Sequence, residues 1–230
     1  MKIDEIKIFE RRVAAAKLSK GISSNVIIEN VIRLIHSRCR GGSVIDYGAG
    51  TGTFLARLHA LRIFDSLAGV DILTKPNTLP ESIDWHERDL NNWFEVGKTF
   101  DLCVSTEVIE HLENPRLTVR NMKRLLKPGG QLILTTPNQE SIRSYCALIF
   151  GGHYAGFLGQ SYPAHITALL RMDLRRIAEE EGFYNVGFSY TNSGGLPKLP
   201  SVKWQEISFN LLRGRLFSDN LIMVANLPAE

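Results

Sequence analysis

The sequence is poor in cysteine. Its 230 residues include only Cys39, Cys103 and Cys146, which are widely spaced and form no Cys-x-x-Cys pair. Such a set provides neither a disulfide framework nor a zinc-binding pattern and indicates reduced thiols. The N-terminus carries acidic residues where a secretion signal would carry an apolar run. Together these absences predict a cytoplasmic protein.

Long hydrophobic runs and concentrated charge are also missing. No stretch approaches the ~18 apolar residues of a spanning helix, so no transmembrane segment is expected. The net charge is only +3, and the densest basic group, Arg171, Arg175 and Arg176, is interpreted as a solvated helix face. Nucleic acid is therefore not the expected partner. The length and the 44% hydrophobic content predict one globular domain, residues 1–230, that binds small molecules.

What the chain does contain is a glycine-rich motif. A β-branched run ends at Asp46, and Gly48, Gly50 and Gly52 follow at alternate positions before a helical pattern at 53–62. Glycines let the backbone turn sharply and let a ligand lie against main-chain N–H groups. Because open α/β sheets bind ligands at the carboxyl ends of their strands, this loop predicts a nucleotide-like cofactor.

Three interpretations of this loop compete. The dinucleotide fingerprint of an oxidoreductase requires a third glycine where Thr53 stands. The phosphate-binding loop requires a lysine that is absent here. The third pattern, Asp-x-Gly-x-Gly-x-Gly, resembles the first motif of the class I S-adenosylmethionine-dependent methyltransferases. In that family the glycines lie under the methionine part of the cofactor, and the acid at the strand end orients its ammonium group.

Hydrophobic periodicity predicts strands that alternate with helices, and hence a parallel sheet covered on both faces. The expected strands are 43–47, 66–71, 83–86, 100–105, 131–136, 184–191 and 219–227, and the expected helices are 4–19, 24–38, 53–62, 115–126, 139–149 and 172–181. Residues 141–168 lack clear periodicity, and an amphipathic piece is expected at 204–213. The layout resembles the Rossmann-like methyltransferase fold, a seven-stranded, mostly parallel sheet whose final strand is antiparallel.

Further blocks strengthen this resemblance. Residues 100–105, 106–112, 126–130 and 135–138 follow the order seen in the subgroup that includes the ubiquinone-biosynthesis O-methyltransferases. The resemblance covers roughly residues 40–190. It implies an N-terminal helical cap at 1–40, a cofactor-binding half at 41–138 and an acceptor-side half at 139–230.

The acids that follow the second and third strands complete the expected cofactor site. Asp71 closes the second strand about twenty residues after the glycine loop, where a carboxylate can accept hydrogen bonds from both ribose hydroxyls. The resemblance assigns adenine contact to Asp89, although Glu87 could take this role after a slip of two residues. The full implied cofactor set is Asp46, Gly48, Gly50, Gly52, Asp71, Ile72, Asp89, Leu90 and Thr106.

Glu107, Glu110 and His111 are the candidate catalytic or metal-binding residues. If their segment is helical, their spacing places all three on one face, and such a set can bind a divalent cation. Related small-RNA 2′-O-methyltransferases use a Glu-x-x-Glu-His set with a later histidine, for which His165 is the counterpart here. The preferred interpretation has no metal, with Glu107 beside the cofactor and His111 as a general base.

The resemblance implies methyl transfer from S-adenosylmethionine to a small molecule. A hydroxyl oxygen is the expected acceptor, in a cell-surface sugar or quinone-like pathway. Two alternatives stay open: an RNA 2′-O-methyltransferase, and a non-catalytic partner protein that only binds the cofactor.

Overall fold

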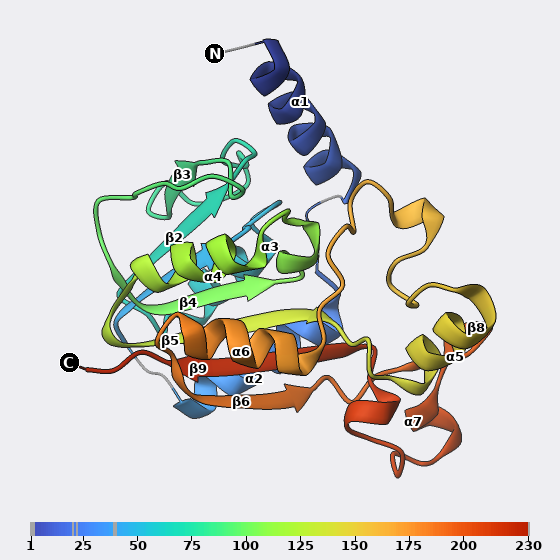
Figure 1. The fold of residues 1–230 in the computed structure, drawn as a ribbon. Helices are drawn as coiled ribbons and strands as arrows, with labels where there is room; N and C mark the ends of the chain where they lie inside the picture. The colour runs from blue at the N-terminus through green and yellow to red at the C-terminus, as the bar shows by residue number, and fades with distance from the viewer. Residues whose placement is uncertain (1–2, 20, 22, 39–40, 230) are drawn as a thin grey trace.

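The protein, described here by a computed structural model of residues 3–19, 21, 23–38 and 41–229, is built on a seven-stranded sheet (Figure 1). Its strands are β1 Ser43–Tyr47, β2 Ser66–Asp71, β3 Asp84–Glu87, β4 Phe100–Thr106, β5 Leu126–Pro137, β6 Tyr184–Tyr190 and β9 Asn220–Asn226. Their order is β3-β2-β1-β4-β5-β9-β6. The first five strands pair in parallel, whereas β9 is antiparallel to both of its neighbours. The predicted Rossmann-like fold is confirmed.

Helices cover both faces of this sheet. The helices are α1 Ile3–Leu18, α2 Asn25–Arg38, α3 Thr53–Leu61, α4 Pro115–Arg124, α5 Ile142–Gly151, α6 Arg171–Glu180 and the short α7 Trp204–Ile207, of which α2 and α3 pack on one face of the sheet and α4 and α6 on the other. Successive residues of a strand point to opposite faces, so Cys103 packs in the core under α4 and α6, and Val104 packs in the core under α2 and α3. None of the helices in the described ranges is long and apolar enough to cross a membrane.

The predicted start of α4 is confirmed, but its end and the start of β5 differ from expectation. The Asn114 side chain accepts a hydrogen bond from the Leu117 N–H, and Pro115 is the first helical residue. The helix ends at Arg124 instead of residue 126, and β5 begins at Leu126 instead of residue 131. The strand begins earlier because Leu126 pairs with Phe100 across an irregularity in the register.

Two segments at the carboxyl side of the sheet were only loosely defined by the sequence. Residues 141–168 form α5 and a single 3₁₀ turn, Gly159–Ser161. Residues 193–217 form a hairpin, β7 Gly195–Leu196 and β8 Leu199–Lys203, followed by α7 and a 3₁₀ turn. The amphipathic helix expected at 204–213 is therefore reduced to one turn. Cys103 and Cys146 are free thiols, and Cys39 lies outside the described residues.

Candidate active site

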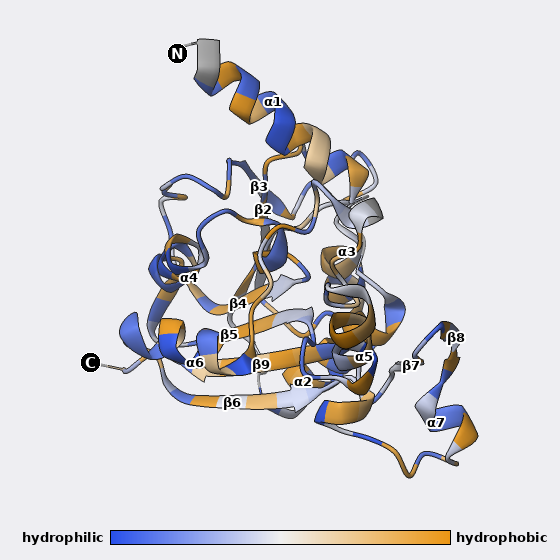
Figure 2. Ribbon diagram, turned by 45° about the vertical axis from the view of Figure 1, so that its right-hand side comes forward, coloured by the Kyte–Doolittle hydropathy of each residue, from blue (hydrophilic) through white to orange (hydrophobic). Residues whose placement is uncertain are grey.

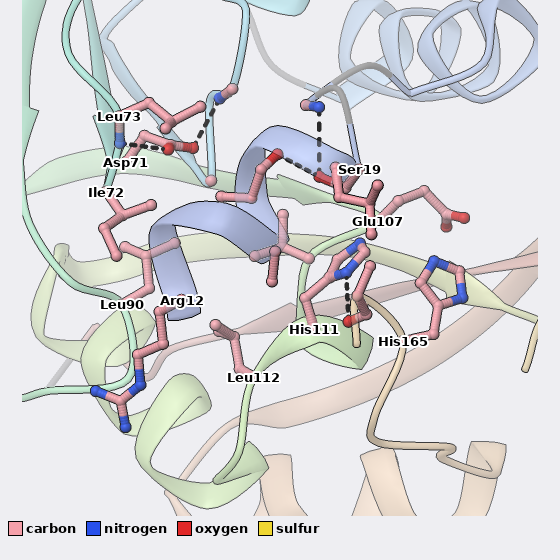
Figure 3. A pocket seen from close by; sticks show the side chains of 18 of the residues that line it. Arg12, Ser19, Asp71, Ile72, Leu73, Leu90, Glu107, His111, Leu112 and His165 are labelled. Carbon is pink, nitrogen blue, oxygen red and sulfur yellow. Dashed lines mark hydrogen bonds between the residues drawn. The ribbon is translucent and has the colours of Figure 1, made fainter. Parts of the chain in front are cut away.

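A cavity of about 750 Å³ lies at the carboxyl ends of β1, β2 and β4, beneath the C-terminal half of α1 (Figure 3). Its volume is in the range of pockets that hold small molecules and cofactors. The predicted cofactor and catalytic residues line it, except Gly52 and the candidate metal ligand Glu110. It is also lined by residues that were not predicted, among them Arg12, Ser23, Leu73 and Asn220.

The glycine loop forms the floor of this cavity. Gly48 and Gly50 have positive φ angles of 84° and 50°, a conformation that side-chain-bearing residues rarely adopt. A Cβ atom at Gly48 would lie 2.4 Å from Val108, and one at Gly50 would lie 2.4 Å from the carbonyl oxygen of Gly21. The protein's own packing against the loop therefore requires glycine at both positions. The loop stays open on the side that faces the cavity.

Asp46, at the end of β1, is a buried carboxylate with an unused oxygen. Its Oδ1 atom has no hydrogen-bond partner among the described residues. Burial, and secondarily the charge of Asp71, raises the pKa of Asp46 to about 8. A buried polar atom without a partner costs about 1–3 kcal/mol. Because the residue lines the cavity, a cationic ligand group such as an ammonium would satisfy it and restore its ionised form.

Asp71, at the end of β2, is held by the backbone. Its Oδ2 accepts a 2.8 Å hydrogen bond from the Gly50 N–H, and its Oδ1 accepts one of 2.8 Å from the Leu73 N–H. Burial raises the pKa of Asp71, and these two N–H donors oppose that rise. Each carboxylate oxygen keeps a free lone pair, so the group can still accept from two adjacent hydroxyls.

Asp89 lines the cavity, but both oxygens of its carboxylate already accept hydrogen bonds from other residues of the protein. Its Oδ2 accepts from Arg12 at 2.7 Å, and its Oδ1 accepts from the Asn91 N–H at 3.0 Å. Arg12 also donates to both oxygens of Glu113, at 3.0 and 2.6 Å. These ion pairs anchor α1 over the cavity. No sequence signal pointed to them, because the partners lie 77 and 101 residues away.

Glu107 faces the opposite end of the cavity. Its φ angle of 56° is unusual for a residue with a side chain and is a form of strain found at functional sites. Thr135 Oγ1 and Asn220 Nδ2 donate to its two carboxylate oxygens, at 3.2 and 2.9 Å. Burial raises the pKa of Glu107 to about 7.

The alignment of Glu107 with Glu110 and His111 depended on a helix at this segment, and no such helix forms. Only a 3₁₀ turn forms, at Ile109–His111. The reason is that the Glu107 N–H still donates to the Thr135 carbonyl at 3.2 Å, so this residue remains tied to β5. Glu107 therefore does not share a helix face with the other two residues.

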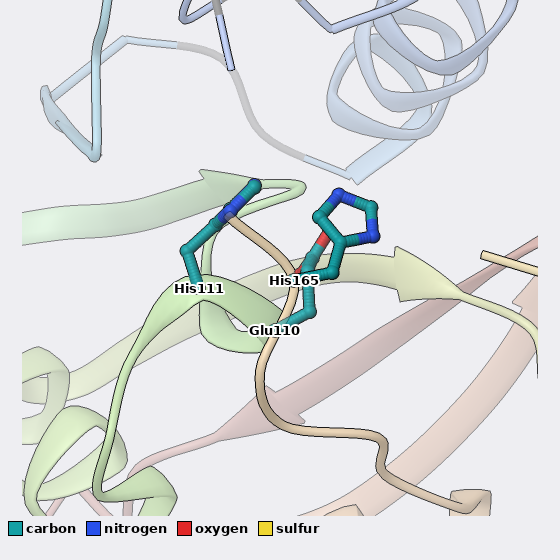
Figure 4. A group of neighbouring side chains, drawn as sticks. All are labelled: Glu110, His111 and His165. Carbon is teal, nitrogen blue, oxygen red and sulfur yellow. The ribbon is translucent and has the colours of Figure 1, made fainter. Parts of the chain in front are cut away.

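A different set of ligand atoms comes together instead. Glu110, His111 and His165 have oxygen and nitrogen atoms within 4.8 Å of one another (Figure 4). Glu110 is fully buried; its Oε2 accepts from Thr136 at 3.0 Å, whereas its Oε1 has no partner among the described residues. Burial, and then the charge of Glu107, raises the pKa of Glu110 well above its usual value.

Both histidines of this cluster are oriented by backbone carbonyls. His111 Nδ1 lies 2.8 Å from the Ala164 carbonyl oxygen, and His165 Nδ1 lies 2.6 Å from that of Gly156. Because a carbonyl can only accept, each Nδ1 donates, and Nε2 is the ring nitrogen of each histidine that remains for a ligand. Burial, and secondarily the neighbouring His165, lowers the pKa of His111 to about 4, so its ring is neutral at physiological pH. Neutral imidazoles and a carboxylate are a donor set that divalent cations bind.

The sheet order, the glycine loop under the cavity and the acids that end β1 and β2 define a Rossmann-like class I methyltransferase. Sequence comparison agrees, because a family model described as "Methyltransferase domain" matches residues 20–187. The chain belongs to this family of S-adenosylmethionine-dependent methyltransferases. It is 30% identical over 137 residues to a mitochondrial ubiquinone biosynthesis O-methyltransferase of Dictyostelium discoideum, an alignment that covers 52% of this chain but only 42% of the relative.

Other similar proteins fit the same class. A ubiquinone biosynthesis O-methyltransferase of Actinobacillus pleuropneumoniae is 25% identical over 171 residues, 65% of this chain and 70% of the relative. An S-adenosylmethionine-dependent methyltransferase of Thermotoga maritima superposes with a TM-score of 0.58 at 15% identity, over 96% of this chain and 95% of that one. The N-methyltransferase NodS of Bradyrhizobium japonicum was solved with S-adenosylhomocysteine. It superposes with a TM-score of 0.54 at 19% sequence identity, over 87% of this chain and 85% of that one.

Proposed function

We propose that this protein transfers the methyl group of S-adenosylmethionine to a hydroxyl oxygen of a small molecule. The observation that carries the proposal is the cavity itself, which has a different chemistry at each end. One end presents the partnerless carboxylate oxygen of Asp46 and the backbone-held Asp71. The other end presents Glu107 and His111, far from the glycine loop in the chain.

In this proposal the cofactor lies along the glycine loop. The Oδ1 atom of Asp46 accepts from its ammonium group, and Asp71 accepts from its ribose hydroxyls. Ile72 and Leu90 supply apolar contact to the adenine ring, and Thr106 lines the cavity beside the glycine loop. Asp89 has less free acceptor capacity than we expected, because it is paired with Arg12, so we assign it first to positioning α1.

The reacting methyl already carries its activation, so the protein contributes orientation, exclusion of water and removal of the acceptor proton. We propose that Glu110, His111 and His165 would hold a divalent cation, which would supply a lowered pKa of the acceptor hydroxyl. The Nε2 atoms of the two histidines and the partnerless Glu110 Oε1 fit this role. Glu107 then faces the acceptor with a carboxylate whose pKa of about 7 suits proton transfer.

Phenolic, quinone-like compounds are the first acceptors to test, since the curated relatives are named for ubiquinone biosynthesis. Sugar hydroxyls come second. RNA fits less well, because Arg11 and Arg12 are the only arginines or lysines among the described residues that line the cavity, and Arg12 is already paired with two acids.

The test is transfer of labelled methyl from S-adenosylmethionine to a panel of catechols, phenols and sugars, before and after chelation. We expect a phenolic product, activity lost on chelation, and recovery with Mg²⁺, Mn²⁺ or Zn²⁺. Full activity in chelated enzyme would overturn the cation and leave the neutral His111 as the base. Binding of S-adenosylhomocysteine without methylation of any acceptor would favour a non-catalytic binding protein.

A further inference from the structure

The segment between β6 and β9 carries three exposed apolar side chains within five residues. Ile207 is 53% exposed, Phe209 90% and Leu211 84%, and we call these three residues the apolar tip. Single exposed apolar residues are ordinary in soluble proteins, but large apolar side chains that gather on one projection mark an interaction surface.

Hydrogen bonds and ring packing hold the residues on either side of the apolar tip in place. The buried Gln205 accepts from the Gly194 N–H at 3.0 Å and donates to the carbonyls of Leu212 and Phe217 at 2.8 and 2.9 Å. The ring of Trp204 packs edge-on against Phe217, with 5.5 Å between centroids. These contacts fasten α7 to the residue before β7 and to the last turn of the segment. The exposure of the tip is a property of this folded arrangement.

The surroundings of the tip are basic. Residues 193–217 contain four basic residues, Lys198, Lys203, Arg213 and Arg215, against the single acid Glu206. Lys198 and Arg213 are exposed, and neither forms an ion pair with any residue that the structure describes. Figure 2 shows β8 and α7 at the outer edge of the molecule, away from the sheet.

We propose that the apolar tip docks this protein on an anionic lipid bilayer. Apolar side chains of a surface segment insert at the headgroup boundary, and basic residues beside them are attracted to acidic lipid phosphates. A protein partner is a poorer fit: a stable interface buries roughly 800 Å² on each side, and one aromatic side chain contributes roughly 150–250 Å². A second copy would also bring the same positive charge to the contact.

The test is sedimentation of the ligand-free protein with two kinds of vesicle, one of phosphatidylcholine and one with phosphatidylglycerol added. We expect binding to the acidic vesicles only. F209S/L211S should abolish it, and K198E/R213E should weaken it by at least ~30-fold, because each basic residue near the surface contributes about 1 kcal/mol and the new acids repel the lipid phosphates. Circular dichroism establishes that both variants fold.

Matched controls separate this proposal from general surface effects. R33E/R176E makes the same change in net charge on α2 and α6, and W93S removes a half-exposed aromatic ring far from residue 209 in the sequence. Both should bind acidic vesicles like the parent. Equal losses in these controls, or no binding by the parent protein, would overturn the proposal. So would a dimer, seen by light scattering, that F209S/L211S converts to monomer. No arm of the test uses methyl transfer, so its outcome is independent of the proposed activity.

Discussion

Two acids stand at or beside each end of the cavity, and the carboxylates at the two ends are held differently. At the cofactor end, Asp71 is held by N–H groups of the backbone. At the acceptor end, Glu107 and Glu110 are held by the side chains of Thr135, Thr136 and Asn220. Backbone donors are supplied by the fold, whereas side-chain donors change with the sequence. The cofactor end is thus fixed by the fold, and the acceptor end can be altered one residue at a time.

The largest expected effect tests the acceptor end. His111→Ala removes one proposed cation ligand and the proposed proton path, so turnover should fall by at least ~100-fold, the lower bound for acid–base groups. Affinity for S-adenosylhomocysteine should change less than about twofold, because His111 acts at the other end of the cavity. Steady-state kinetics and calorimetry measure the two effects separately.

The matched control for this prediction is His59→Ala, which removes an exposed histidine of α3. It should leave both quantities unchanged. Equal turnover in His111→Ala and the parent enzyme would reduce the segment at 109–111 to a packing element.

The next effect tests the cofactor end. Asp71→Ala removes a charged acceptor for two hydroxyls, and hydrogen bonds to charged groups contribute ~1.5–3 kcal/mol. Affinity for S-adenosylhomocysteine should therefore fall ~13- to 160-fold, while turnover at saturating cofactor stays close to that of the parent. Asp71→Asn keeps one acceptor oxygen and should lose less. A folded Asp71→Ala variant with parental affinity would show that the ribose assignment is wrong.

The sequence could bring the residues of the cofactor end together in one place because its signals there are local. The glycine loop and Asp46 lie within a few residues of one another, and Asp71 ends the next strand, so a parallel sheet brings them together wherever the rest of the chain lies. The acceptor end depends on long-range contacts. His165 is 54 residues from His111, and the bond that ties Glu107 to Thr135 prevents the helix that the spacing suggested. Arg12 was missed for the same reason.

A third prediction concerns the unpartnered carboxylate. The folded pKa of Asp46, about 8, lies above its ordinary value of 3.8, so the folded protein holds this proton more tightly than the unfolded chain. The resulting stability is complete below about pH 4 and is lost as the pH rises through 8. Asp46→Asn cannot ionise and escapes this loss.

At pH 9 and without ligand, we expect Asp46→Asn to melt at least ~2 °C above the parent, since ~1 kcal/mol shifts the Tm of a chain of this size by roughly 2–4 °C. At pH 5 the difference should shrink. The same variant should bind S-adenosylhomocysteine more weakly. Thermal melts at both pH values test this prediction. The same difference in Tm between the two proteins at pH 5 and pH 9 would contradict a buried, unpartnered Asp46 carboxylate that awaits an ammonium group.

The smallest effect concerns α1. Arg12→Ala removes partly exposed ion pairs to Asp89 and Glu113, and such pairs contribute about 0.2–1 kcal/mol. Dissociation of S-adenosylhomocysteine should speed up by about 1.5- to 5-fold, measured by stopped-flow displacement. Lys17→Ala, on the same helix, is the control and should release the ligand at the parental rate. An unchanged rate in Arg12→Ala would mean that α1 does not retain the cofactor.

The most direct test of the central claim is a calorimetric titration of the purified protein with S-adenosylhomocysteine and, separately, with NAD. The backbone-built end of the cavity predicts one S-adenosylhomocysteine site per chain, displaced by S-adenosylmethionine, and no heat from NAD. Saturable binding of NAD with no binding of S-adenosylhomocysteine would contradict it.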